Sequence, residues 1–435
     1  MRVRKIILLL LLAVPGLPAM GLELSDAYAL ALHHDPTFLA AVEEYQADQQ
    51  EKAIGRAALL PSLNYTYTNA QNWSDVTQDT QLGEQTIERD YRSYSSVLNL
   101  QQPLFDMAAW AQYRQGVARA LLGNERFRSR SQELLLRVFI SYSEALLAGE
   151  QTRLARSQRE AYAERQTLNQ RLLEGGEGTR TDWLETRARH DLALAQEIEA
   201  ENEVDAALRE LESIIGQPVA LASLSPLTHL DTPAPLQPAS FEAWRDLLLS
   251  GNPELAAQRH GLTVAEQAIR RHRAGHLPKL SLYASTRKTK SDSETSFNQT
   301  YDTDSIGIQL TVPLFAGGGV SALSRQAAYR LEQASHELDA QTSSLLNELR
   351  RQYNLYQTSA TRTHAYEMAV QSASTLVEAT RQSVLGGERV NLDVLDAQHQ
   401  LYSARRDLAD ARHQARLARL QLKYLAGVVD VGDLE

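Results

Sequence analysis

The sequence predicts a mainly α-helical protein with a small β part, in which one long helical hairpin and one β-hairpin each occur twice. Proline is absent from 107–173 and from 320–385, so each stretch can form a single helix of unusual length. Both stretches end at a pair of glycines, after which a new helical pattern begins at once. Two segments bounded by proline, 62–105 and 279–315, instead show the two-residue alternation of strands. The chain is therefore a tandem duplication.

The two glycine pairs mark the points at which the predicted helical hairpins reverse. Gly175 and Gly176 belong to the first pair, and Gly386 and Gly387 lie 211 positions further along the chain. We expect all four glycines to permit the left-handed turn of each reversal. A helix of the predicted length, roughly 100 Å, cannot be the core of a compact domain. It must lie along other helices, as in a coiled coil.

The composition excludes several classes of function. The formal net charge is −10 and the chain contains no Lys/Arg-rich run, which argues against a nucleic-acid partner. Cysteine is absent, so there is no disulfide, no thiolate chemistry and no cysteine-linked lipid. No Ser/His/Asp motif, phosphate-binding loop or dinucleotide fingerprint is present, and His272 and His276 lack the further ligands of a metal site. We therefore expect no enzyme activity, no metal and no cofactor.

The first residues are typical of a secretory signal peptide, which we expect at 1–21. Three basic residues precede an apolar run at 6–14, and Ala19 and Gly21 frame a small-residue cleavage site. A membrane anchor is the alternative, but the run is shorter than the roughly 20 residues that a spanning helix needs. Removal of the three basic residues changes the net charge from −10 to −13.

The first repeat is predicted to span 22–215. Ser25 is expected to cap a short first helix, and a second helix ends before the first strand segment. After the β-hairpin, a long helix runs from Met107 to about Leu173, and a further helix covers 182–215. Each repeat is thus helix, β-hairpin, long helix, glycine reversal and helix.

Residues 216–239 form the one clear linker, because they contain five prolines and lack any period. The second repeat follows at 240–426, with a tail at 427–435. The sequences around Pro253 and Pro278 match those around prolines 217 positions earlier. This constant offset supports the duplication.

Each predicted β-hairpin supplies two strands of about ten residues, the length that crosses a bilayer as a tilted barrel strand. Polar residues at 74–90 are interpreted as the turn of the first hairpin. Four strands cannot close a barrel, and an open edge cannot lie in lipid, so several chains would have to share one barrel. Three chains would give 12 strands, within the range of membrane barrels. The alternative is a soluble coiled-coil protein whose two β-hairpins pack on themselves.

The duplication and three motifs resemble the TolC-type outer membrane factors over essentially the whole mature chain. The motifs are the Leu-Pro-x-Leu strand entries at 60–63 and 277–280, the Val-Pro-Leu-Phe-x-Gly-Gly exit at 312–318, and Asp-Val-Leu-Asp-Ala at 393–397. The resemblance implies a homotrimer in the outer membrane of a Gram-negative bacterium. Its three chains would form a 12-stranded β-barrel and a 12-helix periplasmic tunnel that tapers to a closed tip.

Within the family, residues 382–396 and the short chain end after Gly427 are most similar to the outer-membrane components of type I, alkaline-protease-type secretion. The resemblance implies an exit duct that docks with a periplasmic adaptor (membrane fusion protein) and an inner-membrane ABC exporter. Outer-membrane lipid would surround the barrel, and the exported protein would pass through it. A multidrug efflux channel of the same family is the alternative, and a periplasmic coiled-coil scaffold or adaptor is the alternative from another class.

The resemblance also assigns residues to the tip of the tunnel. Thr181 and Asp182 match one side of the tip closure, and Arg389 matches its cationic partner. The aromatic partner in the family's pattern falls near Gln382 or Val384, neither of which is aromatic, so the second link of the closure has no match in this chain.

Asp393 and Asp396 would line the tip, and three copies of each would form two acidic rings that favour cations. The alternative for Asp182 and Asp393 is a role at the start of a helix, with Glu185 completing a capping box for Asp182. Adaptor docking is expected at the two reversal loops, which contain Gly175, Gly176, Gly386 and Gly387.

Overall fold

The computed structural model describes residues 21–81, 83–227, 235–293 and 296–434. The expected signal peptide at 1–21 therefore lies outside the described residues, apart from Gly21. The described chain divides into two compact units. Unit 1 contains the chain up to Ala41, Ser129–Asn252 and the chain from Ser344, and unit 2 contains Val42–Arg128 and Pro253–Ser343.

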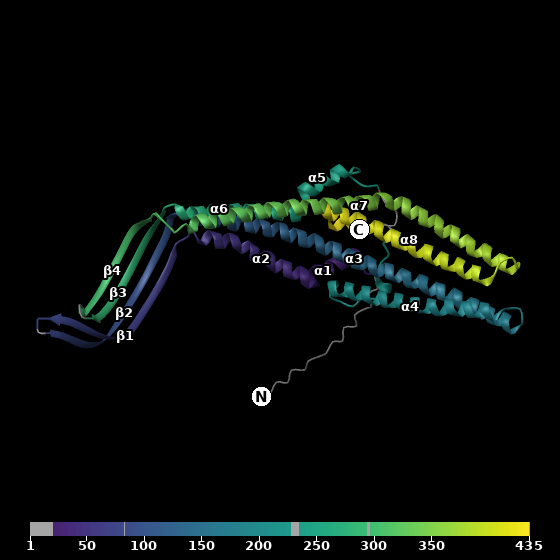
Figure 1. Ribbon diagram of the computed structural model, residues 1–435, viewed down its shortest axis with the longest axis horizontal. Helices are drawn as coiled ribbons and strands as arrows, with labels where there is room; N and C mark the ends of the chain where they lie inside the picture. Colours follow the sequence, from purple (N-terminus) through teal and green to yellow (C-terminus); the bar gives the residue numbers. More distant parts are fainter. Residues whose placement is uncertain (1–20, 82, 228–234, 294–295, 435) are drawn as a thin grey trace, which may run out of the picture. The chain divides into compact units, whose positions relative to one another are not determined.

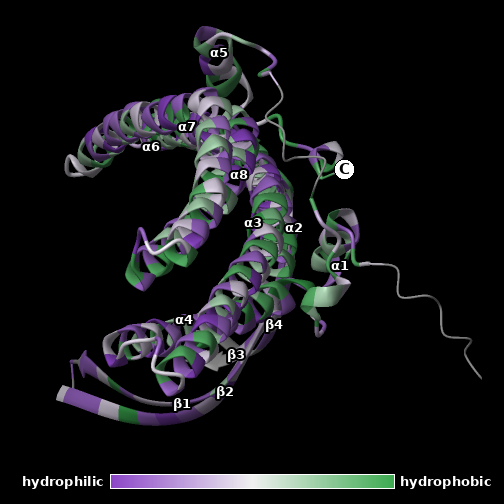
Figure 2. Ribbon diagram, turned by 90° about the vertical axis from the view of Figure 1, so that its right-hand side faces the viewer, coloured by the Kyte–Doolittle hydropathy of each residue, from purple (hydrophilic) through white to green (hydrophobic). Residues whose placement is uncertain are grey.

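Most of the described chain is α-helical (Figure 1). The α-helices are α1 (Leu24–His34), α2 (Pro36–Ala57), α3 (Met107–Glu174), α4 (Arg180–Ile215), α5 (Phe241–Gly251), α6 (Pro253–Arg273), α7 (Gly319–Leu385) and α8 (Asn391–Ala426). The two proline-free stretches form α3 and α7, of 68 and 67 residues. Hydrophilic and hydrophobic residues alternate along these long helices (Figure 2). None of the helices in the described ranges combines the length and the apolar character that crossing a membrane requires.

The expected cap of the first helix is wrong. The helix α1 begins at Leu24, Glu23 occupies the N-cap position without a side-chain hydrogen bond, and Ser25 lies inside the helix. Leu24 is buried, so apolar packing rather than a capping hydroxyl determines where α1 starts. In the second repeat the equivalent Ser240 does cap α5, where its hydroxyl accepts from the Ala243 amide at 3.3 Å.

The described part of the predicted linker is anchored to unit 1. The buried Tyr142 hydroxyl, on α3, lies 2.7 Å from the carbonyl oxygen of Leu22 and 2.8 Å from that of Ser225. Burial raises the pKa of Tyr142 to about 12, so this phenol stays protonated and keeps its donor. Further along, Trp244 donates from Nε1 to the Pro238 carbonyl at 2.7 Å. Two points of the linker, Ser225 and Pro238, are thus hydrogen-bonded to side chains of α3 and α5.

Unit 2 contains one four-stranded antiparallel sheet in the order β1-β2-β3-β4 (Figure 1). Its strands are β1 (Ser62–Thr80), β2 (Gly83–Phe105), β3 (Lys279–Ser293) and β4 (Ser296–Thr311). The pairing of β2 with β3 joins the hairpins of the two repeats into a single sheet. Within the described chain, β1 and β4 are the outer strands, and each presents an edge without a partner strand.

The strands are longer than the sequence suggested. They contain 19, 23, 15 and 16 residues rather than about ten, and β4 ends at Thr311, before the expected 315. Residues 74–90, expected to form a turn, are mostly strand, with Trp73 paired to Asp90 and Thr77 paired to Thr86. Polar side chains on both faces remove the alternation that marks a strand, while the cross-strand backbone hydrogen bonds remain.

The two faces of the sheet differ in polarity near its helical end. Directly paired residues share a face, and one row across the strands consists of Leu63, Leu100, Ala284 and Ile306. The adjacent row, on the opposite face, consists of Asn64, Asn99, Ser285 and Ser305. The apolar face is uncovered by the described chain, since Leu63 is 62% and Ile306 78% exposed. Hairpins that packed on themselves would bury this face, so the packing expected from the soluble alternative is absent from the described sheet.

The helices of unit 2 pack closely because glycines face neighbouring backbones. A Cβ atom on Gly116 of α3 would lie 2.3 Å from the Glu51 carbonyl oxygen of α2. Within unit 2, α6 is also a neighbour of α3, and Gln115 donates from Nε2 to the Val264 carbonyl at 3.4 Å. The start of α3 therefore lies between α2 and α6, next to the strands.

Candidate functional site

The two helical hairpins of unit 1 reverse through turns of the same geometry. In the first, the Glu177 amide donates to Leu172 at 2.9 Å and the Gly176 amide donates to Leu173 at 3.1 Å. In the second, the Glu388 and Gly387 amides donate to Ser383 and Val384 at the same 2.9 and 3.1 Å. These are the two hydrogen bonds of a Schellman motif. The duplication is therefore visible at the level of individual hydrogen bonds.

Only the second glycine of each pair adopts the left-handed conformation. Gly176 has φ +78° and Gly387 has φ +76°, whereas Gly175 and Gly386 do not have positive φ. Of the four glycines expected to permit the turn, Gly176 and Gly387 are therefore the two that adopt the left-handed conformation. A Schellman motif requires one residue with positive φ, at the position that follows the C-cap residue.

The acidic residues at the two reversals occupy the third position of their helices. Thr179, rather than Asp182, is the N-cap of α4, and its Oγ1 accepts from the Asp182 amide at 3.0 Å. The Thr179 hydroxyl also donates to Asp182 Oδ2 at 2.7 Å. At α8, Asp393 Oδ2 accepts from the Val390 amide at 3.3 Å. A capping box of Asp182 with Glu185 is therefore wrong, because the N-cap of α4 lies three residues earlier, at Thr179.

The remaining residues assigned to the tip lie around these caps. Thr181 and Arg389 are exposed, and Arg389 makes no ion pair or side-chain hydrogen bond within the described chain. Asp396 of α8 pairs with Arg189 of α4 at 2.7 Å. The Asp396 side chain is still 58% exposed, so one of its faces remains open to solvent.

A buried polar cluster lies directly behind the tip. Asn169, Thr186 and Asn391 come from α3, α4 and α8 and are 4%, 0% and 7% exposed. Both amide side chains donate to the Thr186 hydroxyl, Asn169 at 2.7 Å and Asn391 at 3.1 Å. Thr186 donates in turn to the Asp182 carbonyl at 2.8 Å. One hydroxyl thus links the first helical hairpin to the start of α8.

Arg165 of α3 completes this cluster. Its Nε donates to Asn391 Oδ1 at 2.6 Å. Burial, and after it the charge of Arg381 on α7, lowers the pKa of Arg165, whereas Asp182 acts in the opposite direction. The guanidinium is therefore held by one neutral acceptor in a site where its charge is disfavoured.

The same side of α3 contacts α8 along much of its length. Tyr162 Oη lies 3.3 Å from the Leu395 carbonyl, and Tyr162 and Leu395 also form an apolar cluster with Ala193 of α4. Four such contacts form what we call the α3–α8 ladder: Arg165–Asn391, Tyr162–Leu395, Gln158–His399 and Gln151–Asp410. Residue numbers fall along α3 as they rise along α8, so the two helices are antiparallel.

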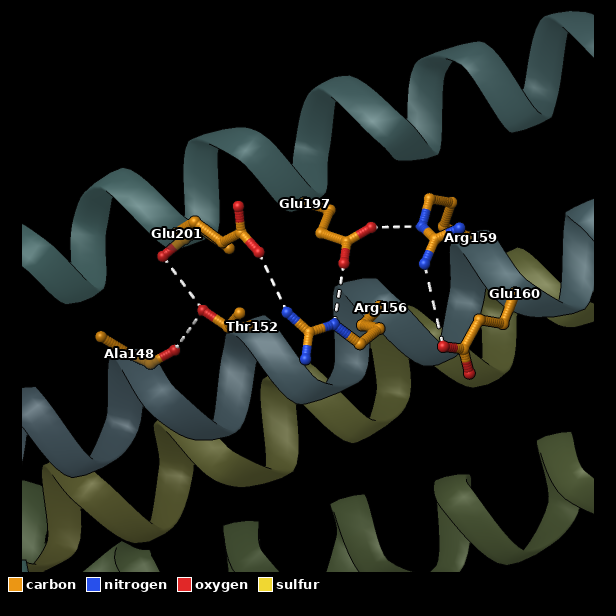
Figure 3. Close-up of polar contacts among 8 residues, drawn as sticks. Ala148, Thr152, Arg156, Arg159, Glu160, Glu197 and Glu201 are labelled. Atoms are coloured by element: carbon orange, nitrogen blue, oxygen red, sulfur yellow. Dashed lines mark hydrogen bonds and ion pairs between the residues drawn. The ribbon is translucent and has the colours of Figure 1, made fainter. Parts of the chain in front are cut away.

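Charged contacts hold α4 against α3 (Figure 3). Glu197 of α4, with a side chain 8% exposed, accepts from Arg156 at 2.9 Å and from Arg159. Arg156 also pairs with Glu201 at 3.0 Å. The hydrogen bond from Arg156 holds the pKa of Glu197 below its ordinary value, against the opposing effect of burial. Polar contacts thus hold α3 and α4 of the first helical hairpin together both at the tip and along their length.

The α3–α8 ladder and the buried cluster were not identified from the sequence. The sequence signal for these contacts is weak, because each contact is made by single polar residues at positions where a helix would otherwise bury apolar ones. Nothing local in the sequence indicates which helix Asn169 and Asn391 face. In the described ranges no group of three His, Cys, Asp or Glu side chains is placed to hold a metal ion.

The sequence of this chain matches the family model described as outer membrane efflux protein at residues 27–217 and 244–428. It is 54% identical to the alkaline protease secretion protein AprF of Pseudomonas aeruginosa, over 96% of this chain and 87% of that protein. It is 47% identical to the proteases secretion protein PrtF of Dickeya chrysanthemi, over 100% of this chain and 94% of that protein.

The fold is similar to the crystal structure of the outer membrane protein VceC from Vibrio cholerae. The TM-score is 0.78 at 18% identity, over 93% of this chain and 96% of that one. Both parts of the family match fall on the repeats deduced from the duplication. The chain belongs to the outer membrane efflux protein family, the TolC-type outer membrane factors that its motifs resemble.

Proposed function

We propose that this chain is the outer-membrane exit duct of a type I protein secretion system. The observation that carries the proposal is the 54% identity to a protein of alkaline protease secretion, which extends over 96% of the chain. The chain is an outer-membrane protein with a large periplasmic part, as its family membership indicates. A proteases secretion protein is also similar over the full chain, which favours protein export over multidrug efflux.

The duct is a homotrimer whose 12 strands close one barrel. The sheet supports this, because β1 and β4 carry edges that a second and a third copy can pair. One face is apolar near its helical end and the other is polar, as lipid and an aqueous lumen require. The helices continue the duct as a 12-helix periplasmic tunnel.

Contacts between neighbouring copies close the tip of this tunnel. Arg389 of one copy meets Thr181 and Asp182 of the next, and the lack of any partner for Arg389 within the described chain supports this role. Asp393 and Asp396 form the acidic rings. The cap at Asp393 and the ion pair at Asp396 each leave carboxylate oxygen available.

The partners are a periplasmic adaptor and an inner-membrane ABC exporter. The adaptor's helical hairpin docks at the reversal loops that contain Gly175, Gly176, Gly386 and Gly387, which are exposed in one chain. The exported protein crosses the duct without chemical change. The family consists of channel proteins rather than enzymes, and no catalytic step is assigned to this chain.

The test is a secretion assay in a host that lacks its own outer membrane factor. The chain is produced together with an alkaline-protease-type ABC exporter, its adaptor and the protease that they export. Protease is expected in the medium only when all three components are present. Retention of the protease despite normal trimers in the outer membrane would contradict the proposal, and restored resistance to toxic drugs instead would support the efflux alternative.

A further inference from the structure

We propose that unit 2 contains a binding site for a membrane phospholipid, in a cavity between the start of α3 and the end of α6. The cavity has a volume of about 550 Å³, which is within the range of small-molecule sites. Its assignment to a lipid rests on the proposed membrane barrel, because α3 and α6 both meet the strands at this end (Figure 1).

The floor of the cavity is buried and contains one polar group without a partner. Ala111, Ala274 and Gln267 line it and are 4%, 3% and 6% exposed. The Oε1 atom of Gln267 has no hydrogen-bond partner within the described chain. A buried carbonyl oxygen costs free energy unless it accepts a hydrogen bond. A ligand that donates a hydrogen bond to the Oε1 atom of Gln267 would therefore satisfy the floor of the cavity.

The walls of the cavity are apolar and accessible. Met107, Trp110 and Leu277 line it and are 42%, 46% and 41% exposed. Large apolar side chains at this exposure are costly in water but suit a hydrocarbon chain. Tryptophan in particular is enriched at membrane–water interfaces.

The rim of the cavity is cationic. Arg114 of α3 and Arg270 and Arg273 of α6 line it, all three are exposed, and none forms an ion pair within the described chain. The dipole of α6 favours basic residues in its last turn, which accounts for Arg270 and Arg273 alone. Arg114 lies near the N-terminal end of α3, where the dipole gives no such preference. The presence of three guanidinium groups around one cavity indicates an anionic ligand.

A phospholipid meets all three requirements at once. Its phosphodiester suits the forked guanidinium donors, a headgroup hydroxyl or amine can donate to Gln267, and an acyl chain can cover the apolar wall. Met107 lies two residues after the end of β2, and Leu277 two residues before the start of β3. In the proposed barrel this is the level of the periplasmic headgroups. Two other anionic ligands fit less well. Inorganic phosphate would leave the apolar wall of the cavity exposed to water, and an acidic peptide gives no reason for the cavity to lie at the strand ends.

The first experiment compares two double variants of the full-length protein, purified as trimers in detergent. Arg270→Gln with Arg273→Gln removes two rim charges, and Arg325→Gln with Arg330→Gln removes two exposed charges of α7 in the same unit. Phosphatidylglycerol binding is measured by native mass spectrometry. The rim variant is expected to bind at least tenfold more weakly than wild type, and the control variant is expected to bind like wild type.

The second experiment tests the floor. Gln267→Leu removes the acceptor at similar volume, and phosphatidylmethanol lacks the headgroup hydroxyls of phosphatidylglycerol. Wild type is expected to prefer phosphatidylglycerol severalfold, and Gln267→Leu is expected to bind the two lipids equally. A preference that survives in the Gln267→Leu variant would remove Gln267 from the site.

Three outcomes would overturn the lipid site. These are equal binding by the rim and control variants, displacement of the lipid by millimolar inorganic phosphate, and binding of an acidic peptide but not of phosphatidylglycerol. The secretion assay and trimer formation are measured on the same variants. A secreting trimer that binds no lipid contradicts this inference alone, whereas the absence of outer-membrane trimers contradicts the proposed function.

Discussion

At the scale of the residue, the turn at the tip depends on the backbone conformation of single glycines. Gly387 has φ +76° and nothing within 4 Å of the place where a Cβ would stand. The cost of a side chain there is therefore conformational rather than steric contact with a neighbour. Gly386, which precedes it, lacks a positive φ and has only backbone oxygens 3.7 Å from its would-be Cβ. The same substitution can therefore be compared at these two adjacent glycines, one with a positive φ and one without.

Gly387→Ala is expected to destabilise the second reversal by about 1–2 kcal/mol, the cost of a left-handed conformation for a residue with a side chain. Gly386→Ala is expected to be neutral or slightly stabilising, because alanine prefers the helix. The measurement is the temperature at which detergent-solubilised trimers dissociate on a gel. Equal effects of the two substitutions would contradict the assigned turn.

His413 of α8 is expected to make the stability of the protein fall in mild acid. It is buried, and desolvation, followed by the charge of Arg416, lowers its pKa to about 4 from the ordinary 6.5. The neutral imidazole is therefore favoured in the fold, and its contribution to stability is complete above pH 6.5 and is lost as the pH falls towards 4. The loss is about 1.4 kcal/mol per pH unit in this window. His413→Gln is expected to flatten the pH dependence of thermal melting between pH 6.5 and 4, and an unchanged slope would exclude His413 as the cause.

Arg389 is the residue on which the proposed closure between copies depends. Arg389→Ser is expected to raise single-channel conductance in planar bilayers, because it removes the charge-assisted contact of the proposed closure. Arg381→Ser on the same helical hairpin is the control, since Arg381 pairs locally with Glu378 at 4.0 Å. If both variants conduct like wild type, the closure does not depend on Arg389.

At the scale of the element, the α3–α8 ladder joins the two helical hairpins of one chain. Its last contact lies at the tip, where Asn391 accepts from Arg165 and donates to Thr186. Movement of the second helical hairpin away from the first at the tip must break this contact. The cluster is buried, so breaking it without a new partner exposes unsatisfied groups.

Asn391→Leu is expected to loosen the tip by about 1–3 kcal/mol, the cost of leaving buried partners unsatisfied. Channel conductance should therefore rise, and amides at the start of α8 should exchange hydrogen faster. Asn391→Asp keeps an acceptor for Arg165 and should have the smaller effect. A variant Asn391→Leu that exchanges and conducts like wild type would show that the ladder does not restrain the second hairpin.

The sequence predicted the elements better than the contacts between them. The ends of α3 and α7 were predicted to within one residue because proline and glycine act locally. The strand at 74–90 was missed because polar residues on both faces leave no alternation to detect. The ladder was missed for a different reason. Side-chain pairs such as Gln151–Asp410 depend on which helix lies beside which, and that is decided by long-range packing.

At the scale of the whole molecule, the sheet determines how many copies are needed. One chain provides four strands with two open edges and an uncovered apolar face. In a closed barrel the two edge strands would pair with strands of neighbouring copies, and lipid would cover the apolar face. The alternation between Ile306 and Ser305 places adjacent residues on opposite faces of the sheet.

This alternation permits a matched test of the trimer. Ile306→Lys puts a charge on the face assigned to lipid and is expected to cost up to roughly 2–4 kcal/mol. Ser305→Lys puts the same charge on the face assigned to the lumen and should be tolerated. Heat-sensitive trimers in outer-membrane extracts are the readout, and they are expected to be depleted only by Ile306→Lys. Depletion by Ser305→Lys instead would reverse the assignment of the faces.

The unequal lengths of the strands have a consequence for the cell. At about 3.4 Å per residue and a tilt near 40°, β1 and β2 would rise about 50–60 Å, whereas the apolar band of a barrel is about 25 Å tall. The first β-hairpin of each copy would then stand clear of the bilayer as a polar projection, and β3 and β4 would end lower. Antibodies and bacteriophages meet a channel from outside at such projections. An epitope tag at the β1–β2 turn should therefore be detectable on intact cells.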